Sequence, residues 1–418
     1  MVPNGWEHKS FKQILKLDRG SSPRPIVNFV TDSDDGVNWI KIGDTKGEAA
    51  FINSTKQKIT KEGAKKSRKV TKGEIILSNS MSYGKPYILN IDGYIHDGWF
   101  VIRNYAENLN RDYLIQLLGG ELVQRQYKRL AAGGVVSNIN SELVYSVKVD
   151  IPPMQEQRKI ANILATWDKA ISATKLLIDN SKQQKKALMQ QLLNSALTNN
   201  RLLDDSGKPF EGAWKEILLE EHIAFLSGHA FKSSEFKKNE KYKLLRGINI
   251  TKGSLRWGEE QTFSWPEDLQ LKKYSLEVND IVISMDGSLV GRNYALISDA
   301  KMEPMLLVQR VARLRCKNTL FYGYLFQHIA SANFKSYVDA VKTVTAIPHI
   351  SAKDIKHFKI PLPTVKEQEK IAAVLTNADK EIVVLERQLA DLKQEKKALM
   401  QQLLTGKRRV KLDEAEVA

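Results

Sequence analysis

The sequence offers little of what disulfide frameworks, metal sites or membrane spans require. Its 418 residues include a single cysteine, Cys316, so an intrachain disulfide is impossible and a thiolate metal cage lacks its other ligands. The seven histidines are scattered without the spacing of metal ligands, and we predict no metal site. No stretch approaches the roughly 18 consecutive apolar residues of a spanning helix, and the first ten residues lack the zones of a secretory signal. We therefore expect a soluble, cytoplasmic protein that does not bind a membrane.

Common catalytic motifs are missing as well. The chain has no phosphate-cradling GxxxxGK[ST], no GxGxxG dinucleotide fingerprint, no GxSxG elbow and no HExxH. It also lacks the [ND]PP[YF] motif of amino-methyltransferases, because Pro152 and Pro153 are preceded by Ile151 and followed by Met154. No motif therefore indicates nucleotide, hydrolase, metalloprotease or methyl-transfer chemistry.

What the chain does have is a surplus of positive charge. Lysine and arginine number 64 against 48 aspartates and glutamates, which gives a formal net charge of +16. This surplus favours a polyanionic partner such as nucleic acid over an acidic small molecule. With 42% hydrophobic and 27% charged residues the chain has an ordinary globular composition, and its length predicts two to three domains.

An internal repeat organises the rest of the sequence. The nonamer KKALMQQLL occurs at 185–193 and again at 396–404, an offset of 211 residues. Applied without a gap, this offset makes 21 of the 43 positions from 151 to 193 identical to their counterparts. The preceding segments correspond more loosely, and 72–85 is similar to 278–292. The resulting order of variable, shared, variable and shared blocks suits a protein that recognises two separate targets better than one with a single catalytic centre.

Each shared block is predicted to form a long helix. Its seam residues recur in alternating steps of three and four, which is the spacing of a heptad repeat. The seam of the second copy is almost entirely apolar, whereas the first includes Thr174, Ser181 and Lys185, so we expect the two helices to pair with each other. Proline-containing turns at 151–153 and 360–363 precede them. About 40 residues at about 1.5 Å rise make each helix roughly 60 Å long, enough to hold two globular domains apart.

The variable blocks are predicted to be rich in β-structure. Turn-then-strand patterns occupy 73–78 and 279–284, Val308–Leu314 alternates like a half-buried strand, and Asn140 and Ser351 are candidate helix N-caps. The predicted fold class is α+β, with two β-containing domains separated by two long helices that form an antiparallel coiled coil of pseudo-twofold symmetry. The expected boundaries are 1–150 for domain 1, 151–200 for helix 1, 201–359 for domain 2, 360–407 for helix 2 and 408–418 for a tail.

These features resemble the specificity (S) subunits of type I restriction-modification enzymes, and the resemblance covers essentially the whole chain. Its most specific parts are the EQ-K-I helix starts at 156–160 and 367–371 and the KKALMQQLL helix ends. The first domain has VVSNI at 135–139 where the second has TAIPHI at 345–350, so residues are not transferred between the domains there. Also similar to the family are GSSPRP at 20–25, SGHAFKSSEF at 227–236 and LLRGINITKG at 244–253.

The resemblance implies a chain without chemistry of its own, which is not an enzyme and binds no cofactor. Each of its two target-recognition domains would bind one half of a bipartite site in double-stranded DNA. Two methyltransferase (modification) subunits would dock through the helices, bind S-adenosylmethionine and flip the target adenine, and restriction (translocase and nuclease) subunits would join later. Two unlike domains on an antiparallel helix pair further predict an interrupted, asymmetric target with half-sites about 34 Å apart.

Several segments supply candidate DNA contacts, each with a plainer alternative. The basic run at 56–72 is either a solvated face or a phosphate-contacting loop. The loops at 20–25 and 227–233 are either surface turns or rigid supports for base contacts. Arg246 and Asn249 form either a structural hydrogen-bonding pair or base contacts, and the glycine-containing loops after the two strands are either hairpin turns or points of close approach to DNA. The candidate DNA-binding residues are Ser22, Arg24, Lys65, Lys66, Arg68, Asn79, Tyr83, Lys85, Lys128, Arg129, Lys232, Ser233, Arg246, Asn249, Ser288, Arg292, Lys342 and Thr343.

Partner docking is predicted on the outer faces of the helices, where the repeated nonamer offers two equivalent surfaces, although helix pairing alone would also explain the repeat. The candidate partner-binding residues are Gln183, Gln184, Lys185, Gln190, Gln191, Gln394, Glu395, Lys396, Gln401 and Gln402. Two other function classes stay open. An enzyme with an unrecognised site would methylate or cleave DNA by itself, and a non-catalytic coiled-coil scaffold that does not read DNA sequence would bind duplexes negligibly.

Overall fold

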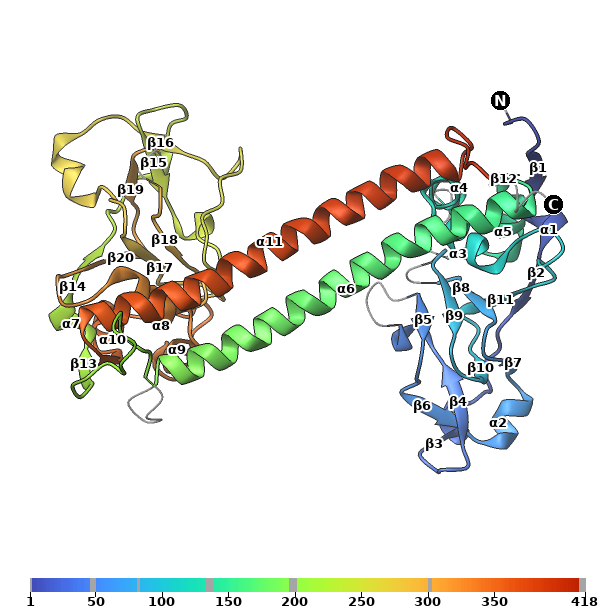
Figure 1. Cartoon of the computed structure of the whole chain (residues 1–418), viewed down its shortest axis with the longest axis horizontal. Coiled ribbons are helices and arrows are strands. Elements are labelled where there is room, and N and C mark those ends of the chain that lie inside the picture. Colours follow the sequence, from blue (N-terminus) through green and yellow to red (C-terminus); the bar gives the residue numbers. More distant parts are fainter. Residues whose placement is uncertain are drawn as a thin grey trace. The chain divides into compact units, whose positions relative to one another are not determined.

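A computed structural model describes residues 2–45, 50–80, 83–131, 138–194, 201–299 and 303–412. The chain forms two compact units, each assembled from separate stretches of sequence. Unit 1 consists of Met1–Lys175 and Arg387–Ala418, and unit 2 of Leu176–Glu386. Each unit therefore contains one variable block together with parts of both long helices (Figure 1).

The two long helices are α6 (Met154–Leu192) and α11 (Val365–Leu403), of 39 residues each. Helix α6 begins directly after Pro153 and α11 two residues after Pro363, because proline cannot continue a helix backwards. The predicted proline-containing turns are in part strand, since residue 151 ends one strand and residues 360–362 belong to another. Within unit 2, Lys185 pairs with Asp379 and Lys182 with Glu386, so a later residue of α6 meets an earlier one of α11. This order is that of an antiparallel pair. Seam residues are buried at the expected spacing, at Ile171, Thr174, Ile178 and Ser181, which confirms the predicted helix pairing.

The described residues of unit 1 form three sheets and five short α-helices. A two-stranded antiparallel ribbon pairs β1 (Glu7–Ser10) with β12 (Lys148–Ile151), next to the start of α6. A five-stranded sheet has the order β2 (Lys16–Arg19), β11 (Trp99–Arg103), β8 (Ile75–Ser78), β9 (Pro86–Leu89) and β5 (Phe51–Ile52). A second has the order β3 (Val30–Thr31), β6 (Gln57–Ile59), β4 (Val37–Ile40), β10 (Gly93–Ile95) and β7 (Arg68–Val70). The short helices are α1 (Phe11–Ile14), α2 (Lys61–Lys65), α3 (Arg111–Gly119), α4 (Glu121–Ala131) and α5 (Ser141–Ser146).

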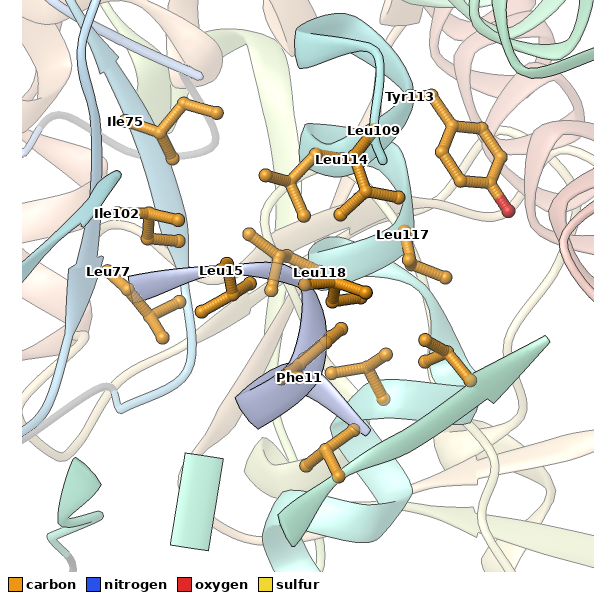
Figure 2. Close-up of a cluster of buried hydrophobic side chains, with 14 of the residues drawn as sticks. Phe11, Leu15, Ile75, Leu77, Ile102, Leu109, Tyr113, Leu114, Leu117 and Leu118 are labelled. Carbon is orange, nitrogen blue, oxygen red and sulfur yellow. The ribbon is translucent and has the colours of Figure 1, made fainter. Parts of the chain in front are cut away.

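Strand β8 shows why its sequence is apolar at successive positions. Side chains alternate between the two faces of a strand, and both faces of β8 are covered. Ile75 and Leu77 enter the main core of unit 1, while Ile76 enters a second cluster of buried residues. Figure 2 shows Leu114 and Leu118 of α3 beside the sheet side chains of the main core. The same core takes in residues from the start of α6 and the end of α11, so the unit and its helix ends share one interior.

Unit 2 repeats this plan. The ribbon is formed by β13 (Lys215–Leu218) and β21 (Lys359–Leu362). A four-stranded sheet has the order β14 (Ile223–Ser227), β20 (Val311–Cys316), β17 (Ile281–Ser284) and β18 (Tyr294–Leu296). A three-stranded sheet has the order β16 (Ser264–Trp265), β15 (Tyr242–Leu245) and β19 (Met305–Leu307). The short helices are α7 (Leu219–His222), α8 (Tyr322–Ala330), α9 (Ala332–Val341) and α10 (Ala352–Lys356).

The structure confirms the α+β class and most of the predicted elements. Strands β8 and β17 lie inside the predicted turn-then-strand segments, and the side chains of Asn140 and Ser351 cap α5 and α10. The predicted strand at Val308–Leu314 begins only at Val311, because Val308 forms an isolated bridge with His229 and residues 309–310 form a turn in which Arg310 has a φ of 68°. The predicted VVSNI segment falls largely outside the described residues. The segment boundaries stay a prediction, since each compact unit includes parts of both helices.

A search of the described helices finds none with the length and apolar character that a membrane crossing requires.

Candidate nucleic-acid interface and helix junctions

The EQ motif at the start of α6 joins this helix to the domain of unit 1. Gln157 is 1% exposed, and its side chain is fully used. Its Nε2 donates to the carbonyl oxygens of Asn108 and Pro152, each at 2.9 Å, and its Oε1 accepts from the backbone N–H of Asn110 at 2.7 Å. The loop before α3 is thereby fixed to the first turn of α6. We call this contact set, with the Glu156 contacts described below, the first junction.

The second junction repeats these bonds in unit 2. Gln368 is fully buried, and its Nε2 donates to the carbonyl oxygens of Thr319 at 3.1 Å and Pro363 at 2.9 Å. Its Oε1 accepts from the backbone N–H of Phe321 at 2.7 Å. The motif that marks each helix start therefore holds a β-containing domain to its helix, and a buried amide with every group satisfied makes this attachment specific.

The glutamate of each EQ motif accepts a hydrogen bond from a tryptophan and pairs with an arginine, and we call this set of contacts the clamp of its unit. In unit 1, Glu156 accepts from the indole N–H of Trp6 at 3.3 Å and from the guanidinium of Arg409, which lies beyond the end of α11. Arg409 also donates to the carbonyl oxygen of Asn4 at 2.7 Å. The segment after α11 is thus tied to the beginning of the chain, within one unit.

In unit 2, the clamp consists of the same three residue types, but its arginine is more buried. Glu367 accepts from the indole N–H of Trp214 at 3.1 Å and from both Nε and Nη2 of the Arg201 guanidinium. The Arg201 side chain is 17% exposed, against 42% for Arg409. The hydrogen bonds that Arg201 donates to Glu367 raise the pKa of Arg201, as those that Arg409 donates to Glu156 raise the pKa of Arg409.

A second repeated contact lies about three turns further along each helix. Asp168 accepts from Gln116 of α3 at 2.8 Å and pairs with Lys396 of α11 at 2.6 Å. The matching bonds in unit 2 link Asp379 with Gln327 of α8 at 3.0 Å and with Lys185 of α6 at 2.5 Å. Each aspartate therefore connects its own helix, the other long helix and the adjacent domain.

These contacts divide the predicted partner-binding residues. The Lys185 and Lys396 side chains are only about 15% exposed and serve the internal ion pairs, so we no longer propose them as docking residues. Gln401 lies on the surface and bonds Glu121 of α4 within unit 1. The remaining candidates lie on exposed positions of the two helices, namely Gln183, Gln184, Gln190, Gln191, Gln394, Glu395 and Gln402.

The structure gathers several predicted DNA contacts of unit 1 around one turn. Gly20 has no room for a side chain, since a Cβ there would lie 2.0 Å from the carbonyl oxygen of His96. The loop after Gly20 is thereby locked against the β10–β11 turn. Ser22 donates to the Asp97 carboxylate at 2.8 Å, and the Arg24 guanidinium lies 3.5 Å from the same group with its side chain 83% exposed. Burial alone would raise the pKa of Asp97, but the Ser22 hydrogen bond and the charges of His96 and Arg24 bring it below its ordinary value.

The basic run adjoins this turn. Ser21 donates to the carbonyl oxygen of Lys66 at 2.9 Å, which connects the Gly20 loop to the segment after α2. Lys65, Lys66 and Arg68 are exposed, and among the described residues no carboxylate lies within ion-pair distance of them. Ser22, Arg24, Lys66 and Arg68 therefore belong to connected surface segments, where a phosphate backbone would meet the positive charges of Lys66 and Arg68.

Other candidates of unit 1 lie elsewhere. Asn79 is 5% exposed and donates its amide to the carbonyl oxygen of Asp97 at 2.9 Å, so it supports the turn and is no longer proposed as a DNA contact. Tyr83 packs against the main core, while Lys85 is exposed. Lys128 and Arg129 are exposed in the last turn of α4, a helix that packs on the core.

The equivalent turn of unit 2 lies between β19 and β20. His229, in the loop of Lys232 and Ser233, accepts from the backbone N–H of Gln309 at 2.7 Å, which holds this loop to the turn. Lys232 and Ser233 are exposed, and Lys232 lies 3.4 Å from Glu235.

Arg246 and Asn249 take structural positions. The guanidinium of Arg246 lies 5.5 Å from the rings of both Phe236 and Phe263, a cation–π arrangement. Asn249 is fully buried and donates to the carbonyl oxygens of Arg256 and Gln261. Burial prevents Asn249 from reaching DNA, so its plainer alternative, a structural hydrogen bond, replaces the predicted base contact.

The last four candidates lie on the loop after β17 and around the end of α9. Ser288 is exposed, and Arg292 and Lys342 both pair with Asp339, at 3.9 Å and 2.5 Å. Thr343 is exposed and accepts from the backbone N–H of His349 at 3.0 Å.

Sequence reasoning missed the acidic residues that organise both turns, Asp97 and Asp286, and it missed Arg310. Asp286 pairs with Arg310 at 3.1 Å and also contacts His349, although the three residues are far apart in the chain. A period or a motif does not reveal such a cluster, and the positive φ of Arg310 that marks it is visible only in the structure.

Among the described residues, no group of three or more histidine, cysteine or acidic side chains is placed to hold a metal ion. Burial raises the pKa of the Cys316 thiol to about 12, so the thiolate form is disfavoured.

Comparison with known proteins places these features in a family. The family model described as the type I restriction modification DNA specificity domain matches residues 3–180 and again residues 211–394. The specificity subunit of the type I restriction enzyme MjaVIII from Methanocaldococcus jannaschii is 26% identical over 98% of this chain and 94% of its own length. That of EcoAI from Escherichia coli is 35% identical over 40% of this chain and 29% of its own. The crystal structure of a type I S subunit from M. genitalium matches 97% of both chains at a TM-score of 0.59 and 15% identity, which shows a shared fold.

Proposed function

Because this chain belongs to the family of type I restriction-modification DNA specificity subunits, we propose that it recognises a bipartite, asymmetric DNA sequence, with one half read by each unit. The prediction of family membership is confirmed, and with it the prediction that the chain is a specificity component and not a catalytic subunit. The family match does not support the alternative of a scaffold that ignores DNA sequence.

One observation carries the proposal: the specificity domain occurs twice, with the same attachment to the helices and different surface chemistry. Both junctions use a buried glutamine with equivalent bonds. The turns that face the variable loops differ, since unit 1 has Asp97 where unit 2 has Gln309, as the matching backbone bonds to the neighbouring loops show. Two copies of one recognition domain whose DNA-facing surfaces differ are expected to recognise two different half-sites.

The partners follow from the same premise. We propose that the chain acts with methyltransferase and restriction subunits, with two methyltransferase subunits on equivalent surfaces of the repeated helices. The exposed glutamines of each nonamer, Gln190 and Gln191 in one and Gln401 and Gln402 in the other, are part of these surfaces. S-adenosylmethionine would bind to the methyltransferase, and the complex would work in the cytoplasm.

Methylome mapping tests the proposal. The chain is co-expressed with the methyltransferase subunit encoded beside it, in a host that lacks other adenine methylation. We expect methylation at a split, asymmetric motif, and no methylation when either subunit is expressed alone. An uninterrupted motif, or methylation by this chain alone, would contradict the proposal.

A further inference from the structure

The turn between β19 and β20 of unit 2 has an arginine at a position whose backbone conformation favours glycine. Arg310 has a φ of 68°, in the left-handed region that residues with a Cβ adopt rarely. The corresponding position in unit 1 is Gly98, since Asn79 N–H donates to its carbonyl oxygen as Met285 N–H donates to that of Arg310, both at 2.9 Å, but Gly98 does not have a positive φ. A strained backbone is kept where the structure around it fixes it, and such positions concentrate at functional sites.

Two backbone hydrogen bonds hold this turn to the segment 228–229, in addition to the bond from Met285. The backbone N–H of Gln309 donates to His229 at 2.7 Å, and the N–H of Gly228 donates to Val311 at 3.0 Å. The turn is therefore a rigid platform, and a rigid platform is what selective contact with a base edge requires.

The Arg310 side chain is oriented by a carboxylate. Its Nε lies 3.1 Å from Oδ2 of Asp286, and its side chain is 65% exposed, while that of Asp286 is only 17% exposed. The other carboxylate oxygen contacts His349 Nδ1, and the Asp286 backbone is held through the bond from Gly287 N–H to the carbonyl oxygen of Pro348 at 3.0 Å. Because Asp286 engages Nε, the two terminal nitrogens of the guanidinium remain for a ligand.

We propose that Arg310 reads a guanine in the half-site of unit 2 and that Asp286 is its positioning residue. Two parallel N–H donors match the O6 and N7 acceptors of guanine in the major groove. A phosphate is the poorer partner here, since the Asp286 carboxylate repels an anion but not the neutral edge of a base. Thr343 belongs to the same cluster through its bond from His349. This inference rests on the proposed function and adds to it a base and a residue.

The same argument does not extend to unit 1. Arg24 approaches Asp97 through a terminal nitrogen, Nη2, at 3.5 Å. Its two terminal nitrogens are therefore not both available to donate to one guanine. The two units therefore present different arginine geometries, and the guanine assignment concerns unit 2 alone.

The test maps the methylation motif of the complex for the wild-type chain and a set of variants. Arg310→Asn removes the guanidinium but keeps a residue that tolerates the left-handed region, and Arg310→Gly does the same without a side chain. Arg310→Lys keeps the charge but not the paired donors. Asp286→Asn keeps the shape of the positioning residue. Arg256→Asn, which removes another exposed arginine of unit 2, is the matched control.

We expect Arg310→Asn, Arg310→Gly and Arg310→Lys each to lower discrimination at one G·C pair of one half-site by about ten- to a hundred-fold. Every other position should stay as in the wild type. Asp286→Asn should lower discrimination at the same pair by less, and a double variant with Arg310→Asn should show no further loss, because the carboxylate acts through the arginine. Arg256→Asn should leave the motif unchanged.

Three outcomes would overturn the inference. An unchanged motif in Arg310→Asn and Arg310→Gly would show that no base is read, and retained discrimination in Arg310→Lys would indicate a phosphate contact. A loss spread over all positions in variants whose thermal unfolding matches the wild type would remove the assignment to one base. A wild-type complex without a split motif would instead contradict the proposed function itself, so the two failures are distinguishable.

Discussion

The two units of this protein are alike where the helices enter them and unlike where DNA is expected to bind. Gln157 and Gln368 make the same three kinds of bond, and Asp168 and Asp379 the same pair of contacts. The β10–β11 turn of unit 1 and the β19–β20 turn of unit 2 share backbone hydrogen bonds to their neighbouring segments, but they carry Asp97 in one unit and Arg310 in the other. The comparison teaches that duplication preserved the contacts that attach a domain to its helix and left the reading surface to change.

A closer comparison finds two differences inside the repeated core. The clamp arginine is more buried in unit 2 than in unit 1. At the offset of 211, the buried Leu117 of α3 corresponds to His328 of α8, which is 4% exposed. Burial lowers the pKa of His328 to about 3, and among the described residues its Nε2 has no hydrogen-bond partner. These differences predict that the two units respond unequally to matched substitutions.

The largest expected effect is that of Arg201→Ala. It leaves the fully buried Glu367 carboxylate without its cation, which is expected to lower the free energy of unfolding of unit 2 by about 3–5 kcal/mol. Arg409→Ala should cost unit 1 less, because water reaches that clamp. Denaturant unfolding followed by tryptophan fluorescence measures the loss, and hydrogen exchange assigns it to a unit. Equal losses in the two variants would remove this difference between the units.

His328→Leu gives unit 2 the residue of unit 1 and should remove an acid sensitivity. The folded-state pKa lies below the unfolded value of about 6.5, so the unfolded chain binds the extra proton and stability falls as pH drops from about 6.5 towards 3. At about 1.4 kcal/mol per pH unit, the loss reaches about 3 kcal/mol at pH 4. Unfolding measured between pH 7 and 4 should show a smaller loss for the variant. Leu117→Met is the control in unit 1, and an identical pH profile for His328→Leu and wild type would contradict the prediction.

Combined Lys65→Ala, Lys66→Ala and Arg68→Ala substitutions distinguish sequence-independent binding of DNA from recognition of its sequence. If these exposed cations neutralise phosphates, binding to every duplex falls, and the magnitude of the salt slope decreases by about 0.9 for each phosphate that is no longer neutralised. The methylation motif should not change, in contrast to the Arg310 variants. Equilibrium binding at several salt concentrations provides the measurement. An unchanged slope would assign the basic run to a solvated face.

The smallest effects concern the paired lysines of the helices. Lys185→Ala and Lys396→Ala each remove one cation from an aspartate that keeps its glutamine and is partly open to water, so we expect a loss of about 1–2 kcal/mol. The two losses should be equal within error, because the contacts match. Thermal unfolding of both variants checks this, and a difference above about 1 kcal/mol would show that the repeat is less symmetric than its contacts.

The helices and the two central strands were predictable because their signals are local. A heptad seam or an apolar run after a turn is set by neighbours along the chain, and α6, α11, β8 and β17 follow it. Asn79 and Asn249 were predicted on the surface but are buried, because amide side chains suit both a base edge and a buried carbonyl, and the sequence does not state which one is near. Arg310 was missed since its importance comes from Asp286 and His349.

By itself, the sequence determined the duplication, the helical period, the family and the positive charge, because each is a property of order and composition. Only the tertiary structure decided which residues of the repeat meet. It placed Arg409 on Glu156 and Arg201 on Glu367, and it turned the motif that begins each helix into a joint with the adjacent domain. The paired residues lie 253 and 166 positions apart, where packing and not local preference selects the partner.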